Sequence, residues 1–430
     1  MKKGIGIGLL GLGVVGSGVA QVLLQKADFL ERQAGSPLSL KRVLVRHPGK
    51  RRSLKLAPAL LTTRAEDILQ DPAVDIVVEV IGGESPAREY IREALQRGKS
   101  VVTANKEVMA KYGPELLALA GEKGVFLRFE ASVGGGIPLI APFQRDIRAN
   151  DIRVIHAIIN GTCNYILTRM AREGAEFAEA LKSAQELGYA EADPTNDIEG
   201  IDASYKLAIL ASLAFQMVVR PEDVYREGIS RLALRDFKFA REMGYAIRLL
   251  AIAKRDGDSV EVRVHPVLLP EDYLLAKVDG VFNAVQVEGD LCGKLLFYGQ
   301  GAGALPTSSA VVADILAIAQ KLRCAAPDSS RVSFDQQFRI KPMAEIRLRY
   351  YLRMNVADRP GVLAQISRVL GDNLISISSV IQKESDPTAQ TTELVIMTHP
   401  ALERDMQKAL AEMERLTVVK EVSNFLRVEV

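Results

Sequence analysis

Cysteine, histidine and tryptophan are scarce in this sequence of 430 residues. Tryptophan is absent, and the three cysteines, Cys163, Cys292 and Cys324, are odd in number and far apart. The four histidines form no cluster in the sequence. This usage excludes a dense disulfide framework and gives no zinc-ligand spacing, because both need paired or closely spaced side chains. We therefore expect a protein of the reducing cytoplasm without a zinc site.

Neither charge of one sign nor a long apolar run dominates the chain. Lys and Arg number 55 against 53 Asp and Glu, so the net charge of +2 gives no field that attracts nucleic acid or an anionic membrane. Residues 1–20 resemble a secretory signal, but their many glycines are poor for a signal helix. No later run reaches the roughly 18 apolar residues that a membrane span needs. We expect neither nucleic-acid nor membrane partners.

Glycine is concentrated near the start of the chain. A buried strand is predicted over residues 5–10 and a helix over 14–30, with Gly11-Leu-Gly-Val-Val-Gly16 between them. A glycine triplet between a strand and a helix favours close approach of the backbone to a pyrophosphate, whose charge is met by the N–H groups of the helix start. A plain strand–turn–helix is the alternative.

Strands and helices alternate through the first 130 residues. Further strands are predicted over 40–45, 75–81, 100–103 and 125–130, and helices over 65–70, 87–97 and 113–122. Such alternation is typical of an α/β fold with a doubly wound parallel sheet of Rossmann type.

The end of the second predicted strand bears on the choice of dinucleotide. An acid at this place often binds the ribose diol of NAD, but this chain has Arg46, followed by Lys50-Arg-Arg52. Cations here favour the 2′-phosphate of NADP. A solvated basic loop is the alternative.

Acids and one lysine gather over residues 191–206, where a helix is expected to begin. Asp202 and Lys206 lie four residues apart and would share one helical face. A lysine held between apolar packing and carboxylates can act as a positioned proton donor, and carboxylates can hold a substrate ammonium. Taken alone, the same stretch also fits a helix start with capping acids.

The remainder of the chain changes character twice. Residues 131–138 form a glycine-rich crossing, and a second glycine-rich loop over 299–307 leads into a helix over 308–322. Residues 324–346 are interpreted as a linker. The last segment, 347–430, has the order strand–helix–strand–strand–helix–strand, which is the ferredoxin-like plan.

Several short motifs resemble one enzyme family when they are taken in order. They are Gly11-x-Gly-x-x-Gly16, Val78-Glu-Val-Ile-Gly-Gly83, Thr103-Ala-Asn-Lys106, Glu130-Ala-Ser-Val-Gly-Gly-Gly-Ile-Pro138, Asn160-Gly-Thr-Cys-Asn164, Glu191-Ala-Asp-Pro194, Asp202 to Lys206 and Gly301-Ala-Gly-x-x-Pro-Thr307. Together they resemble homoserine dehydrogenase, which interconverts L-aspartate 4-semialdehyde and L-homoserine. The last segment resembles an ACT domain, a small amino-acid-sensing module.

The resemblance implies a domain plan for the whole chain. A dinucleotide-binding Rossmann domain is expected over 1–131, completed by the helix over 306–323. An α+β catalytic and dimerisation domain follows over 132–305, then the linker and the ACT domain over 347–430. It also implies a homodimer or homotetramer, a place in threonine, methionine and isoleucine biosynthesis, and feedback regulation by threonine.

Site residues follow from the same resemblance. Lys206 is expected to be the proton donor and Lys106 a second essential base or donor. The substrate-binding residues are expected to be Glu191, Asp202, Gly161 and Thr162. The cofactor-binding residues are expected to be Gly11, Leu12, Gly13, Val14, Val15, Gly16, Arg46, Thr103, Asn105, Lys106 and Gly303. A sodium ion or similar monovalent cation is expected at Glu130, Val133, Gly135 and Ile137, largely through backbone carbonyls. An effector loop is expected at Asp358, Gly361, Val362, Leu363 and Asn373, with a purely dimerising role for this domain as the alternative.

The chemistry of the residues agrees with the resemblance. Reduction of an aldehyde by a hydride from NADP, or from NAD as the alternative, builds negative charge on oxygen, so a cation that delivers a proton lowers the barrier. Two competing hypotheses are another amino-acid semialdehyde dehydrogenase and a non-catalytic amino-acid sensor that binds NADP. A thioester mechanism would use Cys163 with His156, but a strand followed by a turn is expected there rather than one helical face.

Overall fold

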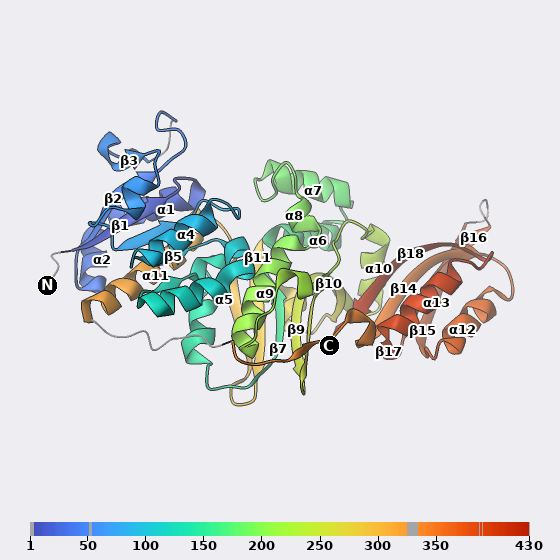
Figure 1. Ribbon diagram of the computed structural model, residues 1–430. Coiled ribbons are helices and arrows are strands. Elements are labelled where there is room, and N and C mark those ends of the chain that lie inside the picture. Colours follow the sequence, from blue (N-terminus) through green and yellow to red (C-terminus); the bar gives the residue numbers. More distant parts are fainter. Residues whose placement is uncertain (1–3, 51–53, 325–333, 387, 389, 430) are drawn as a thin grey trace. The chain divides into compact units, whose positions relative to one another are not determined.

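The structure is a computed structural model that describes residues 4–50, 54–324, 334–386, 388 and 390–429 (Figure 1). Its contacts divide the chain into two compact units, and each is described by itself. The first unit comprises residues 1–153, 205–223 and 287–337, and the second comprises 154–204, 224–286 and 338–430. None of the helices in the described ranges combines the length and the apolar character needed to cross a membrane.

The first unit contains a six-stranded parallel sheet with the strand order β3-β2-β1-β4-β5-β6. Its strands are β1 (Ile5–Leu10), β2 (Leu38–Leu44), β3 (Leu61–Thr62), β4 (Ile76–Glu79), β5 (Ser100–Thr103) and β6 (Leu127–Arg128). The order reverses between β1 and β4, as in dinucleotide-binding folds. The predicted doubly wound sheet is therefore confirmed.

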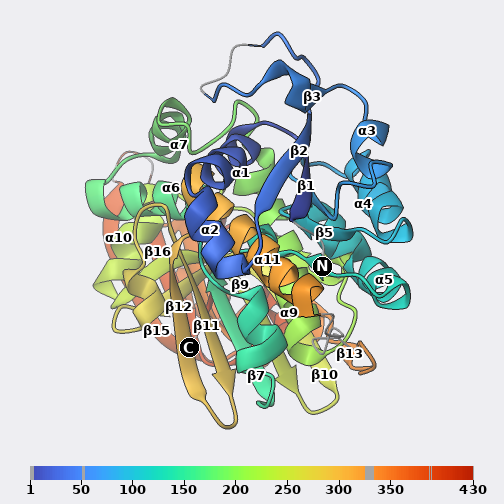
Figure 2. The ribbon, with the colours of Figure 1, turned by 90° about the vertical axis from the view of Figure 1, so that its left-hand side faces the viewer.

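Helices cover both faces of this sheet (Figure 2). The six helices are α1 (Val14–Gln25), α2 (Ala27–Ala34) and α11 (Ala304–Cys324) on one face, and α3 (Glu66–Leu69), α4 (Ala87–Gln96) and α5 (Lys106–Lys123) on the other. Alternate residues of β1 explain the two layers. Ile7 and Leu9 join the core with α1, α2 and α11. Gly8 points the other way, and a Cβ there would lie 2.3 Å from Ile68 of α3.

Three predicted helix boundaries are wrong in this unit. The helix predicted over 14–30 is two helices that meet at Lys26, which caps α1 through its backbone N–H. The helix predicted from 113 begins at Lys106, because the N-cap is Asn105, whose side chain accepts from Val108 N. Pro114, a residue type that is common in the first turn of a helix, here lies inside α5. The helix predicted over 308–322 extends over α11, 304–324.

The second unit contains most of a large mixed sheet with the order β11-β7-β9-β10-β18-β14-β16-β15. Its strands are β7 (Ile152–Ile158), β9 (Tyr245–Asp256), β10 (Ser259–Pro270), β11 (Phe282–Gly289), β14 (Arg347–Ala357), β15 (Ile377–Asp386), β16 (Thr391–Thr398) and β18 (Val419–Val428). Strand β12 (Gly293–Gln300) belongs to the first unit. The helices before the tail are α6 (Gly161–Glu173), α7 (Phe177–Glu186), α8 (Thr195–Ile198) and α10 (Leu234–Glu242). Helix α9 (Ile201–Phe215) runs across the division.

The C-terminal part of the second unit has the predicted strand–helix–strand–strand–helix–strand order. Its helices, α12 (Val362–Asp372) and α13 (Glu403–Met413), pack beside each other and share one apolar core with the strands (Figure 1). Strand β18 is antiparallel to β14 and parallel to β10. Part of the predicted linker is structured, because the short strand β13 (Arg339–Ile340) pairs with β10. Residues 325–333 of that linker lie outside the described residues.

Candidate active site

The glycine turn after β1 has the geometry of a phosphate cradle. Gly11 has a φ of +104°, which favours glycine. A Cβ at Gly16 would lie 2.1 Å from the carbonyl oxygen of Gly11, so only glycine lets the turn close this tightly. Gly13 is the N-cap of α1, and no described atom lies within 4 Å of its Cβ position. The start of α1 is therefore open to an anion, and Val14 beside it is 72% exposed.

A buried polar group lies at the carboxyl end of β4 in the same sheet. The Glu79 carboxylate accepts from Thr103 Oγ1 at 2.6 Å and from Ile81 N at 2.7 Å. Burial raises the pKa of Glu79, and these neutral hydrogen bonds offset the rise only in part. The carboxylate holds Thr103 and the turn after β4 in place at the edge where parallel sheets bind ligands.

Lys106 emerges at this same edge. It is the first residue of α5 and is half-buried. Asn105 before it is fixed in two ways, since its Oδ1 caps α5 and its Nδ2 donates to Gly83 O at 2.7 Å. Thr103, Asn105 and Lys106 therefore lie together at this edge, and hydrogen bonds of Thr103 and Asn105 fix the segment.

The residues expected to select the dinucleotide lie just beyond β2. Arg46 follows two residues after the end of the strand and is exposed. Arg51 and Arg52 lie outside the described residues. Gly303 has a φ of +122° and precedes α11, and a Cβ at Gly18 would lie 2.3 Å from Ser308 Oγ. This close packing of α1 on α11 positions the second glycine-rich loop in the first unit.

The segment expected to hold a cation is a tight turn with a buried acid. The Glu130 carboxylate accepts three backbone N–H groups, from Leu139 at 2.5 Å, Ile140 at 2.8 Å and Ala141 at 2.7 Å. The side chain is therefore used to close the loop, which leaves backbone carbonyls as the oxygen donors of this segment. Gly134 and Gly135 both have positive φ, at +73° and +54°.

A second carboxylate is buried beside this loop. Asp314 of α11 accepts from Glu130 N at 2.8 Å, and burial raises its pKa to about 7. Hard cations bind oxygen ligands, so the expected cation depends on the backbone carbonyls of this loop. Within the described ranges, no group of three or more His, Cys, Asp or Glu is arranged as a metal cluster.

In the second unit, one amide connects the starts of three helices. Asn160 Oδ1 accepts from Cys163 N at 2.8 Å and so caps α6. Its Nδ2 donates to Asp197 Oδ1 at 2.7 Å and to Asp202 Oδ2 at 2.9 Å. Asp202 is only 3% exposed. Thr162 Oγ1, at the same helix start, donates to Tyr189 O at 2.7 Å.

The two residues that the sequence placed on one helical face are both in α9. Asp202 lies in its first turn and Lys206 follows one turn later, half-buried. Gly161, the first residue of α6, is half-buried, whereas Glu191 is exposed. Cys163 is fully buried with its Sγ 3.1 Å from Asp197 O, which gives the thioester hypothesis no exposed nucleophile.

The predicted effector residues lie at the two ends of α12. Gly361 is the N-cap with a φ of +88°, and Leu363 is 41% exposed. Asn373 is buried at the other end, where its Nδ2 donates to Val369 O and Glu412 Oε2. Asp358 N donates to Gln390 O. A cavity of about 920 Å³ in the same unit lies elsewhere, against α13 and β18.

Four polar residues of these sites were not singled out from the sequence. Asn160 is part of a quoted motif, and Asp197 is part of the acid-rich stretch. Their polar side chains within these segments could have marked them as candidate site residues. Glu79 ends a short apolar strand, and a buried acid at that position is itself a signal. Asp314 lies on an ordinary amphipathic helix, and only the fold brings it to Glu130.

A Rossmann sheet with an open glycine turn, joined in one chain to an ACT-like fold, is the architecture of a dinucleotide-binding enzyme with a C-terminal ACT-type domain. Family profiles match residues 11–130 (homoserine dehydrogenase, NAD-binding domain), 138–316 (homoserine dehydrogenase) and 350–417 (ACT domain). The chain belongs to the homoserine dehydrogenase family.

Full-length relatives and solved structures agree. The homoserine dehydrogenases of Bacillus subtilis and Neisseria gonorrhoeae are 42% and 44% identical, each over 99% of both chains. The crystal structure of a homoserine dehydrogenase from Thiobacillus denitrificans is 46% identical, with a TM-score of 0.93 over 99% of this chain and 98% of that one. A hyperthermophilic archaeal homoserine dehydrogenase in complex with NADPH is 28% identical, with a TM-score of 0.62 over 75% of this chain and 98% of that one.

Proposed function

We propose that this homoserine dehydrogenase reduces L-aspartate 4-semialdehyde with Lys206 as the proton donor. The bound dinucleotide supplies the hydride. The carbonyl oxygen gains negative charge as the hydride reaches carbon, and the Lys206 ammonium transfers a proton to that oxygen, which yields the hydroxyl of L-homoserine. Lys106 is assigned a second role at the nicotinamide and the substrate. Its place at the end of β5 supports this assignment.

The amino-acid end of the substrate is assigned to the second unit and the start of α9. Asp202 and Glu191 would hold the ammonium, and Gly161 and Thr162 would line the same end. The observation that carries this proposal is the spacing on α9, where a buried carboxylate lies one turn before a half-buried lysine. A substrate with an ammonium near its aldehyde matches that order of charges along one helix.

NADP is the proposed dinucleotide, with NAD as the alternative. Two observations support NADP: Arg46 stands where NAD-specific sheets often have an acid, and an archaeal relative was solved with NADPH. The cofactor-binding residues are assigned as Gly11, Leu12, Gly13, Val14, Val15, Gly16, Thr103, Asn105 and Gly303. The two cofactors differ by one phosphate, so Arg46→Glu is expected to raise the Kd for NADPH more than that for NADH.

A monovalent cation, with sodium as the first candidate, is proposed at the loop of Glu130, Val133, Gly135 and Ile137. Carbonyl oxygens of this loop would be the ligands, because the Glu130 carboxylate is occupied by three N–H groups. Sodium titrated into metal-free enzyme is expected to raise the melting temperature. Replacement of sodium by choline at equal ionic strength should remove that gain.

The C-terminal fold is assigned a regulatory role. Threonine is the proposed effector, at the loop of Asp358, Gly361, Val362 and Leu363 and at Asn373. A homodimer or homotetramer of the cytoplasm is the proposed form. Millimolar threonine is expected to lower the rate. An unchanged rate would reduce this domain to a role in assembly.

The catalytic assignment is tested by Lys206→Met. Loss of a proton donor is expected to lower kcat by about 10²–10⁴-fold while NADPH binding, followed by its fluorescence, is kept. Lys111→Met is the matched control. Lys111 is held by Glu84 and Glu107, which raise its pKa, so it is a structural cation. If folded Lys206→Met enzyme keeps full turnover, the assignment is wrong.

A further inference from the structure

Asn160 is a highly connected side chain next to the proposed substrate-binding acids. It is 5% exposed, and its amide uses one acceptor and two donors. The acceptor caps α6, and the donors reach Asp197, in α8, and Asp202, in α9. A primary amide has two N–H donors, so both donors are assigned to carboxylates.

The two carboxylates make this arrangement costly without the amide. Asp202 is nearly fully buried, and a buried carboxylate needs donors to replace water. Two acids that share one donor group also repel each other and would otherwise turn apart. A neutral amide satisfies an oxygen of each acid without cancelling their negative charge. That charge is what an ammonium ligand requires.

We infer that Asn160 is a positioning residue that fixes the carboxylate of Asp202, together with that of Asp197, in the orientation that binds the substrate ammonium. This inference rests on the proposed role of Asp202. It assigns no contact between Asn160 and the substrate. The effect is exerted through the acids, so it should appear in substrate affinity.

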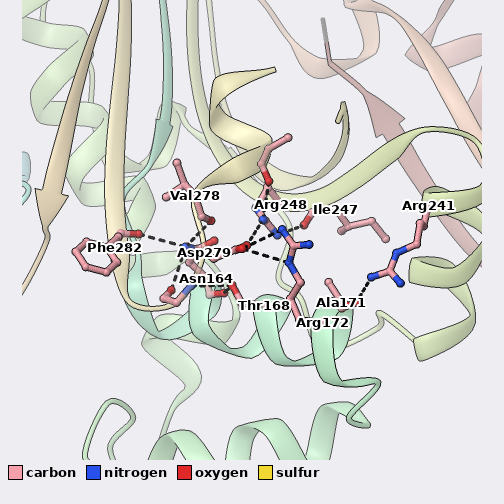
Figure 3. Close-up of polar contacts among 12 residues, drawn as sticks. Asn164, Thr168, Ala171, Arg172, Arg241, Ile247, Arg248, Val278, Asp279 and Phe282 are labelled. Atoms are coloured by element: carbon pink, nitrogen blue, oxygen red, sulfur yellow. Dashed lines mark hydrogen bonds and ion pairs between the residues drawn. The ribbon is translucent and has the colours of Figure 1, made fainter. Parts of the chain in front are cut away.

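Two further side chains of the same helix, Asn164 and Thr168, make a contrasting set of contacts (Figure 3). Asn164 Nδ2 donates to the carbonyls of Val278, Gly280 and Phe282, at 3.0, 3.0 and 3.2 Å. Thr168 Oγ1 accepts from Gly280 N at 2.9 Å. The partners of Asn164 and Thr168 are all backbone atoms, so these two side chains anchor α6, and the acid drawn beside them, Asp279, is held by Arg172 and Arg248. The pair provides a structural control on the same helix.

The test compares Asn160→Ser with Asn160→Asp in the full-length enzyme. Serine keeps a capping acceptor for α6 but has a single O–H on a shorter side chain in place of two N–H donors, so at least one of the two donations is lost. We expect the KM for homoserine to rise about 10–100-fold, the size of a lost charge-assisted hydrogen bond, with kcat within a few-fold of wild type. The Kd for NADPH is expected to stay within twofold. Thr168→Val should lower the melting temperature without changing the KM for homoserine.

The Asn160→Asp variant adds a readout that a structural role would not produce. The introduced carboxyl group keeps the cap but stands as a third acid beside two others, so its pKa should rise. At pH 8 this variant is expected to bind homoserine more weakly than Asn160→Ser. Near pH 6 the introduced carboxyl group takes up a proton and regains one donor, so the KM of Asn160→Asp relative to wild type should recover at least about fivefold, while Asn160→Ser shows no recovery.

Asp202→Asn separates the two possible failures. If Asp202→Asn leaves the KM for homoserine unchanged, the proposed substrate role of Asp202 fails, and this inference fails with it. If Asp202→Asn weakens binding but both Asn160 variants keep the wild-type KM, only the inference about Asn160 is wrong. Support requires non-additivity, meaning that Asn160→Ser raises KM by a clearly smaller factor in the Asp202→Asn background, where only the donation to the Asp197 carboxylate remains to be lost, than in the wild-type enzyme.

Discussion

The edge of the parallel sheet and the junction between β10 and β18 both bury charged groups, with opposite results. At the sheet edge, Glu79 meets only neutral donors in its described hydrogen bonds, and burial raises its pKa. At the junction, Glu429 accepts from Arg263 Nη2 at 2.6 Å and from Lys254 Nζ, which hold its pKa well below its usual range despite burial. Burial disfavours charge unless cations are built in beside it.

The partners of these two buried acids differ because one lies at the edge where a cofactor is expected to bind and the other lies in a junction that stabilises the fold. Glu79 lies among the expected cofactor-binding residues, and its described hydrogen-bond partners are a hydroxyl and backbone N–H groups. The charged groups of the junction are paired with other groups of this chain. Strand β18 pairs both with β14 of the ACT domain and with β10. A second buried acid of the junction is also paired with a cation. Glu403 accepts from Arg427 Nη2 at 2.5 Å and from Arg427 Nε at 3.0 Å.

The largest expected effect comes from breaking the junction. Arg263 is fully buried, and Arg263→Met leaves Glu429 buried with less compensation. We expect a loss of about 3–5 kcal/mol in the free energy of unfolding, measured by urea denaturation. The double variant Arg263→Met with Glu429→Gln should recover part of this loss, because the buried Glu429 carboxylate is then absent, while Lys254 and Glu261 each lose one partner. A loss under about 1 kcal/mol in the single variant would contradict the structural role.

The glycine turn provides the next largest effect, at the sheet edge. Gly16→Ala places a Cβ where the carbonyl oxygen of Gly11 now lies, at 2.1 Å. The turn must open, so the Kd for NADPH is expected to rise at least about tenfold, measured by fluorescence titration, with the ACT domain unaffected. Gly371→Ala is the control, since its Cβ meets no described atom within 4 Å. Equal NADPH affinity in both variants would show that the glycine turn is not part of the cofactor site.

The two regions should also respond to pH with opposite signs. Burial lowers the pKa of His156 and His265 near the junction, so the folded state binds fewer protons than the unfolded state. Junction stability is therefore present above about pH 6.5 and is lost as pH falls below it, and Glu429 adds a further loss below about pH 4.5. The raised pKa of Glu79 acts the other way, because its contribution is lost as pH rises.

Hydrogen exchange by mass spectrometry at pH 8 and pH 5.5, corrected for intrinsic rates, measures both regions at once. Peptides of β10 and β18 should lose protection at pH 5.5, whereas those of β4 and β5 should keep or gain it. Parallel changes in both regions would contradict the assignment of the buried groups. The comparison uses one sample, so global differences in preparation cancel.

The sheet edge was more predictable from sequence than the junction. Glycine spacing and strand–helix alternation depend on local geometry, so Gly11, Gly16 and the parallel strands could be found without tertiary information. Arg263 and Glu429 are 166 residues apart, and only the pairing of β10 with β18 brings them together. Asn105 lies between these cases. Its capping role is local, but the predicted helix begins at Gly113, seven residues after its true start at Lys106, so the prediction misses the cap.

The smallest expected effect sharpens the account of Glu79. Glu79→Gln keeps the shape and the acceptor for Ile81 N but removes the ionisable group. Because the charged form is the one that burial penalises, we expect a change within about 1 kcal/mol at neutral pH and a weaker loss of stability as pH rises above 4.5, the ordinary pKa of a glutamate. Thermal unfolding from pH 4.5 upward measures it, with Thr103→Val as a control that removes the donor and retains the acid. An unchanged pH slope in Glu79→Gln would mean that the carboxyl does not titrate there. In that case the contrast between the two regions would rest on the paired charges of the junction alone.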